Sequence, residues 1–96
     1  MSVSIDIIQM WLDEIAESLP DEVFKDLNGG VALLPEQKIS PHARAGDLFI
    51  MGEYVVHRYI GRLIYIYYGS IMQVYGNAPD FLIKRELKKI LCHELI

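Results

Sequence analysis

The sequence has a single cysteine, Cys92, among its 96 residues. One cysteine cannot form an internal disulfide, and this usage predicts a reducing, cytoplasmic setting. The sequence also lacks any apolar run close to the ~18–20 residues that cross a membrane. Its first residues have neither the basic start nor the apolar stretch of a secretory signal. We therefore expect a cytoplasmic protein without a membrane partner.

Positive charge is scarce, with nine Lys and Arg against 13 Asp and Glu and a formal net charge of −4. A nucleic-acid-binding domain needs a concentrated basic face, so we expect no nucleic-acid partner. Lys25 is the only base in residues 1–30, and this acidic stretch is typical of a solvated helix surface. The basic residues between 84 and 89 are interpreted in the same way.

Hydrophobic residues, by contrast, make up 52% of the sequence. A typical domain has ~100–150 residues, so the length predicts a single domain over residues 1–96. A chain of this size buries about 60–65% of the surface that it exposes when unfolded. We therefore expect one modest core.

The first predicted element is an amphipathic helix that Ser4 can cap. Apolar residues recur along it at spacings of three and four, which predicts a buried stripe, and Trp11 and Ile7 beside the stripe are expected in the core as well. Pro20 suits the first turn of a short second helix, and Asn-Gly-Gly at 28–30 ends that helix. The stripe consists of Ile5, Ile8, Leu12, Ile15 and Leu19.

The middle of the sequence favours β-structure. Residues 31–34 form a short apolar run that predicts a buried strand. Residues 48–51 and 54–56 predict further strand segments, and Gly52 between them suggests a bulge or a close backbone approach. Residues 63–68 alternate branched and aromatic side chains and form the strongest predicted strand.

The remaining segments connect these strands and close the chain. Residues 35–47 contain two prolines and are predicted to be a loop, and residues 58–61 a hairpin turn. A last helix begins near Pro79 and runs to the end of the sequence. The resulting order predicts an α+β fold, with N-terminal helices and a small mixed or antiparallel sheet that packs with the last helix.

The last helix carries the sharpest chemical signal. Glu94 falls near the middle of its apolar face, and His93 falls at the edge of that face. A carboxylate in such a place is costly unless it is paired, protonated or bound to something. Breaks of this kind in a regular pattern are expected at functional sites. The apolar face consists of Ile83, Leu87, Ile90 and Leu91.

His-Glu on a helix begins the zinc motif His-Glu-x-x-His, in which two histidines bind one metal ion. The glutamate of this motif takes a proton from metal-bound water. The sequence contains His93-Glu94-Leu95-Ile96 and ends one residue before the second histidine of the motif. The alternative is a frayed helix end at which Glu94 simply reaches solvent.

Three segments carry a resemblance to a known family. Gly52-Glu53-Tyr54 matches a Gly-x-Tyr that follows an apolar strand, and residues 68–71 loosely match an Arg-Gly-Pro-Ile-like turn. The segment Ile90-Leu91-Cys92-His93-Glu94 matches a helix that leads into Val-Leu-His-Glu. In these segments and their order, the chain resembles the minimal zincin-like metallopeptidases, a family of small bacterial proteins with a His-Glu-x-x-His-His helix.

The resemblance implies a zinc-dependent metallopeptidase that hydrolyses peptide bonds, with zinc as cofactor and a peptide or protein as substrate. It implies that His93 is a zinc ligand and that Glu94 is the catalytic base. In zincins the substrate lies extended along a sheet edge, for which residues 63–68 are the candidate. The alternative function is a non-catalytic peptide- or protein-binding module of the same fold.

The family's second histidine and closing C-terminal helix have no counterpart in the sequence. We therefore expect a zincin-like domain that lacks its C-terminal end, binds zinc weakly or not at all, and is inactive or impaired as a peptidase. The apolar residues near the end of the last helix predict a homo-oligomer that associates through this truncated helix.

Overall fold

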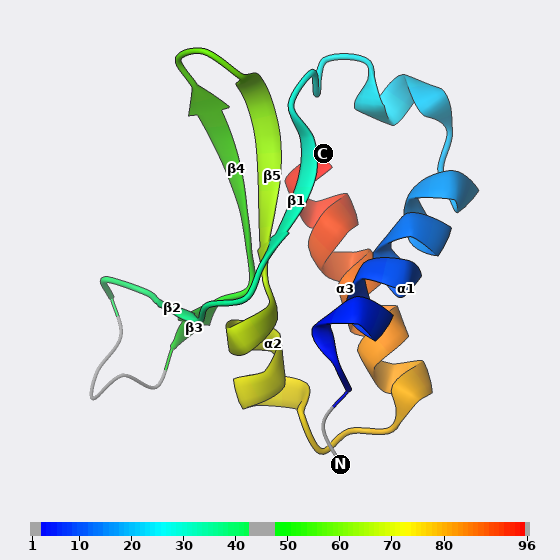
Figure 1. Cartoon of the computed structure of the whole chain (residues 1–96), viewed down its shortest axis with the longest axis vertical. Helices are drawn as coiled ribbons and strands as arrows, with labels where there is room; N and C mark the ends of the chain where they lie inside the picture. The colour runs from blue at the N-terminus through cyan, green and yellow to red at the C-terminus, as the bar shows by residue number, and fades with distance from the viewer. Residues whose placement is uncertain (1–2, 43–47, 96) are drawn as a thin grey trace.

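The computed structural model describes residues 3–42 and 48–95 and has an α+β fold, as the sequence predicts (Figure 1). These residues form three α-helices, one four-residue 3-10 helix, a three-stranded mixed sheet and a two-stranded antiparallel sheet. The described elements are α1 (Ile5–Ser18), η1 (Asp21–Phe24), β1 (Gly30–Leu34), β2 (Lys38–Ile39), β3 (Phe49–Ile50), β4 (Gly52–His57), β5 (Gly61–Tyr67), α2 (Tyr68–Tyr75) and α3 (Asp80–Leu95). None of the helices is long and apolar enough to cross a membrane, as far as the described residues go.

The main sheet has the strand order β1-β5-β4. Strand β1 runs parallel to β5, and β4 runs antiparallel to β5. The prediction that residues 63–68 form a sheet edge is therefore wrong, because β5 is the central strand. Its buried residues point to both faces of the sheet, as expected for a strand with neighbours on both sides: Leu63, Ile64, Ile66 and Tyr67. The edges of this sheet are β1 and β4.

Strands β2 and β3 form a separate antiparallel pair. The chain passes from this pair into the main sheet at Met51, whose carbonyl accepts the Tyr67 N–H at 2.9 Å. The predicted loop over residues 35–47 is wrong in part, because it contains β2 at Lys38–Ile39. Residues 43–47 lie outside the described part of the chain.

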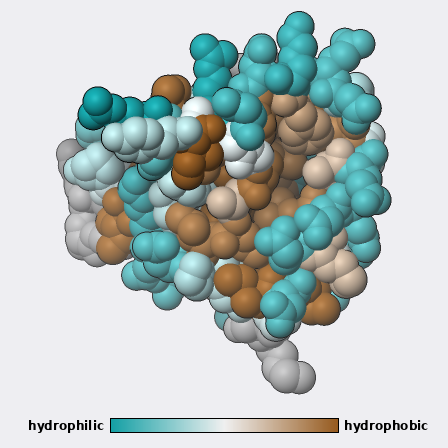
Figure 2. Space-filling model, turned by 45° about the horizontal axis from the view of Figure 1, so that its top comes forward, coloured by the Kyte–Doolittle hydropathy of each residue, from teal (hydrophilic) through white to brown (hydrophobic). Residues whose placement is uncertain are grey.

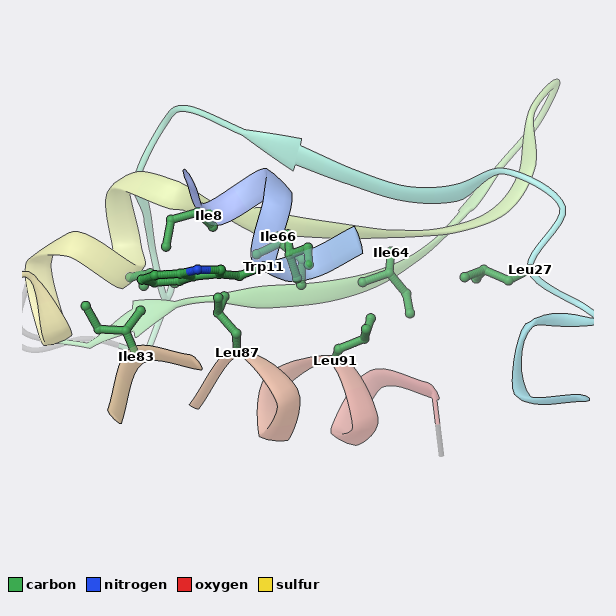
Figure 3. Close-up of a cluster of buried hydrophobic side chains, with 10 residues drawn as sticks. Ile8, Trp11, Leu27, Ile64, Ile66, Ile83, Leu87 and Leu91 are labelled. Carbon is green, nitrogen blue, oxygen red and sulfur yellow. The ribbon is translucent and has the colours of Figure 1, made fainter. Parts of the chain in front are cut away.

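The core lies between the main sheet and the helices α1 and α3 (Figures 1 and 3). The predicted stripe of α1 is confirmed at Ile8 and Leu12, and Trp11 is buried beside them. The prediction for Ile7 is wrong, because this side chain is 37% exposed. Ser4 caps α1, since its hydroxyl accepts the Ile7 N–H at 3.3 Å.

A charged contact joins the two sheets. Lys38 of β2 donates to both carboxylate oxygens of Glu53 in β4, at 2.8 and 3.0 Å, and the Tyr67 hydroxyl donates to the same carboxylate at 2.9 Å. The hydrogen bond with Lys38 lowers the pKa of Glu53 and raises the pKa of Lys38. Burial, followed by the hydrogen bond with Glu53, raises the pKa of Tyr67. Because Glu53 pairs with Tyr65, this contact lies on the sheet face opposite Ile64 and Ile66.

Candidate functional site

A cavity of about 460 Å³ lies where the β3–β4 segment faces the C-terminal half of α3. We call it the β4–α3 cavity. His93 and Glu94 both line it, so the structure brings the two predicted site residues to one cavity. The other lining residues are Phe49, Ile50, Met51, Gly52, Lys89 and Ile90.

The helix face that carries Glu94 differs in one respect from the prediction. The apolar face of α3 is confirmed, with Ile83, Leu87 and Leu91 buried against the sheet. Glu94, however, is half-buried at the margin of this face and lines the cavity. The reason is that this side of α3 lies over Gly52, at the start of an edge strand, where the sheet ends. The carboxylate therefore faces the cavity without the desolvation cost of a fully buried charge.

Gly52 allows α3 to lie this close to β4. A Cβ atom at this position would lie 2.7 Å from Cγ2 of Ile90 and 3.5 Å from Cγ of Glu94. The first of these distances is shorter than any normal contact, so even alanine would displace Ile90. The sequence signal at Gly52 is thus explained by a close approach of helix and strand, one of the two explanations that the sequence left open.

The outer edge of β4 adjoins this cavity. The register pairs Glu53 with Tyr65, and Met51 accepts a hydrogen bond from Tyr67. Because hydrogen-bonded positions alternate along an antiparallel pair, every second residue of β4 directs its N–H and C=O away from β5. The outward groups belong to Gly52, Tyr54 and Val56. Among the described residues, no strand pairs with them.

Apolar side chains extend along this outer edge. Tyr54 is 40% exposed and Val56 is 72% exposed, and both share the sheet face of Ile64, towards α3. The strip at this edge consists of Tyr54 and Val56. One face of the whole molecule also carries a hollow in which apolar side chains gather between polar ones (Figure 2). An exposed apolar strip beside unpaired backbone groups is typical of a surface that binds another chain.

The described residues do not by themselves fit a zinc ion. A zinc site in a peptidase uses three protein ligands and keeps a fourth position open. In residues 3–42 and 48–95, no group of three His, Cys, Asp or Glu side chains could hold a metal ion. At the β4–α3 cavity, His93 is exposed and offers one imidazole beside the Glu94 carboxylate.

Sequence reasoning missed the wall of the cavity opposite His93 and Glu94. The sequence predicts only strand residues at Phe49, Ile50 and Met51, and it predicts a solvated helix face at Lys89. Only Gly52, which interrupts an apolar strand pattern, indicated that another element approaches the chain there.

No family model and no curated protein matches the chain. Among solved structures, the chain is similar to a conserved hypothetical protein from Thermus thermophilus, with 26% sequence identity and a TM-score of 0.78. The likeness covers 96% of this chain and 90% of that one. It extends over α1, the sheet and α3 together, so the two proteins share one α+β architecture.

Proposed function

We propose that the β4–α3 cavity and the outer edge of β4 form the peptide-binding site of a zinc-dependent metallopeptidase domain. In this proposal His93 is one metal ligand and Glu94 is the general base. One observation carries it: His93 and Glu94 line a cavity that adjoins a strand at the edge of the sheet. An extended peptide can add to such an edge through main-chain hydrogen bonds, and pockets beside the edge accept its side chains.

The peptide-binding step follows from the backbone of β4. An added strand would form hydrogen bonds with the outward groups of Gly52, Tyr54 and Val56. Side chains of a strand alternate between faces, so every second peptide side chain would point towards α3 and the cavity. The peptide backbone would then pass in front of His93 and Glu94. This binding step needs no metal ion.

The described residues cannot catalyse hydrolysis alone. They supply His93 as a single imidazole at the cavity, so further zinc ligands would have to come from outside residues 3–42 and 48–95. Glu94 remains the proposed base because its carboxylate lines the cavity beside His93. In this proposal the described residues would bind the peptide and supply the base, and the metal site would be completed elsewhere.

We expect the chain to retain far less than one zinc ion per molecule after it is loaded with zinc and dialysed against metal-free buffer. A lone imidazole cannot hold the metal where a stable site needs three ligands. Metal analysis by mass spectrometry would measure the content, and addition of zinc should not lead to cleavage of a fluorogenic peptide. One tightly held zinc ion per monomer would contradict this expectation.

The second candidate function is a peptide- or protein-binding module without catalysis. It is favoured by the strand edge at β4, which has no neighbouring strand among the described residues, and by the lack of a metal-ligand set in the same part of the chain. A zinc titration followed by NMR separates the two. If His93 is a ligand of a weak site, its imidazole signals should shift first, and the shift should disappear on chelation. Imidazole signals that do not respond to millimolar zinc would favour the binding module.

A further inference from the structure

The lining of the β4–α3 cavity is mostly apolar and contains one lysine. Ile50, Met51 and Ile90 supply aliphatic surface, and Phe49 adds an aromatic ring. Burying a large apolar side chain of a ligand against such a lining is favourable. Lys89 supplies the positive charge, and its side chain is 65% exposed.

The charge of Lys89 is only partly neutralised by its own helix. Its ammonium lies 3.5 Å from Oε1 of Glu86, and the Arg85 guanidinium lies 3.6 Å from the same oxygen. The Tyr75 hydroxyl also donates to Glu86, at 3.5 Å. One carboxylate is therefore shared between two cations and a phenol, so Lys89 can attract a further anion at the cavity.

The lining also contains the carboxylate of Glu94, which repels an anion. Glu94 follows Lys89 by five residues, which along an α-helix is a rise of ~7.5 Å and a turn of ~140°. Two residues of an extended peptide span a comparable ~6.8 Å. A peptide that runs along α3 can therefore place one acidic residue near Lys89 and away from Glu94.

We infer that this site selects peptides with a large apolar side chain and an Asp or Glu within two residues of it. This inference rests on the proposed peptide-binding function and adds its specificity. The apolar side chain lies between the β3–β4 segment and Ile90, and the acidic side chain pairs with Lys89.

The test uses short fluorescein-labelled peptides with β-branched flanks, and fluorescence anisotropy measures their affinity. The parent peptide contains Leu and, two residues later, Glu. Exchange of Leu for Asn should weaken binding about tenfold, in line with the lost apolar burial. Exchange of Glu for Gln should weaken it about three-fold, as expected for a solvent-exposed ion pair, and 0.5 M salt should remove this second difference.

Lys89→Glu should reverse the charge preference, so that the peptide with Lys in place of Glu binds better than the parent. Lys88→Glu is the matched control, because Lys88 is an exposed residue of the same helix that does not line the cavity. It makes the same change of net charge and should leave the preference unchanged. Lys89→Gln, which should abolish the preference, provides a second variant if Lys89→Glu disturbs the helix, as circular dichroism would show.

Equal binding of all peptides would overturn the inferred specificity and leave the proposed peptide site in place. Equal effects of Lys88→Glu and Lys89→Glu would also overturn it, because the preference would then reflect net charge alone. Failure of every peptide to bind would overturn the proposed function and, with it, the specificity.

Discussion

Replacing Tyr54 with proline should lower the affinity of the chain for an extended peptide at least ~tenfold and leave the fold intact. The Tyr54 N–H points away from β5, so proline removes a donor that only an added strand would use. Proline is tolerated on edge strands when the missing N–H faces outward. The loss combines one hydrogen bond of ~0.5–1.5 kcal/mol with the bulk of the proline ring at the outer edge of β4.

Two neighbouring substitutions control for the loss of the tyrosine ring and for general damage to the strand. Tyr54→Thr removes the same ring but keeps the N–H and a residue that favours strands, so it should bind much better than Tyr54→Pro. Val55→Pro removes an N–H that faces β5 and should destabilise the protein strongly. Anisotropy titrations and thermal melts measure the two effects. Equal peptide affinities for Tyr54→Pro and Tyr54→Thr would show that the outer edge of β4 does not bind the peptide.

Leu87→Ala should reduce the free energy of unfolding by ~2–5 kcal/mol, which lowers the Tm by at least ~10 °C in a domain of this size. The Leu87 side chain has no exposed surface, and it projects from α3 towards the sheet beside Trp11 (Figure 3). Truncation would leave a hole that the surrounding side chains fill only in part. The change would also loosen the helix that forms one wall of the β4–α3 cavity.

Phe81→Ala is the matched control for Leu87→Ala, because Phe81 lies on the same helix but is 71% exposed. It removes more atoms than the change at Leu87, yet it should shift the free energy of unfolding by less than ~0.5 kcal/mol. Thermal melts followed by circular dichroism would compare the two variants. A larger loss from Phe81→Ala would mean that the packing face of α3 has been assigned wrongly.

The face of α3 could be predicted from the sequence because it depends on local periodicity alone. Strand pairing is different in kind, since β1 and β5 pair in parallel across a separation of more than thirty residues, from Val31 to Ile64. No turn connects them directly, so no local signal indicates that β5 has two neighbours. The sequence feature that favours a central strand is the presence of apolar residues on both faces of β5, including Leu63 and Ile64, and the structure buries both of them.

For the candidate site, too, the sequence predicts what is local and leaves out what depends on long-range packing. His93 and Glu94 are adjacent on a helix, so the sequence alone places them together. The opposite wall of their cavity comes from residues 49–52, about forty positions earlier, and this contact depends on the packing of α3 against the sheet. Gly52 marks the place of closest approach, but a glycine in a strand does not identify its partner.

The most direct test of the peptide site is amide hydrogen exchange along β4, measured by NMR with and without the Leu- and Glu-containing peptide. In the free chain, the amides of Glu53 and Val55 should be protected by their bonds to β5, whereas those of Tyr54 and Val56 should exchange rapidly. Saturation with the peptide should protect Tyr54 and Val56 and complete an uninterrupted strand. Tyr54 and Val56 amides that still exchange rapidly when the peptide is bound would contradict binding at the outer edge of β4.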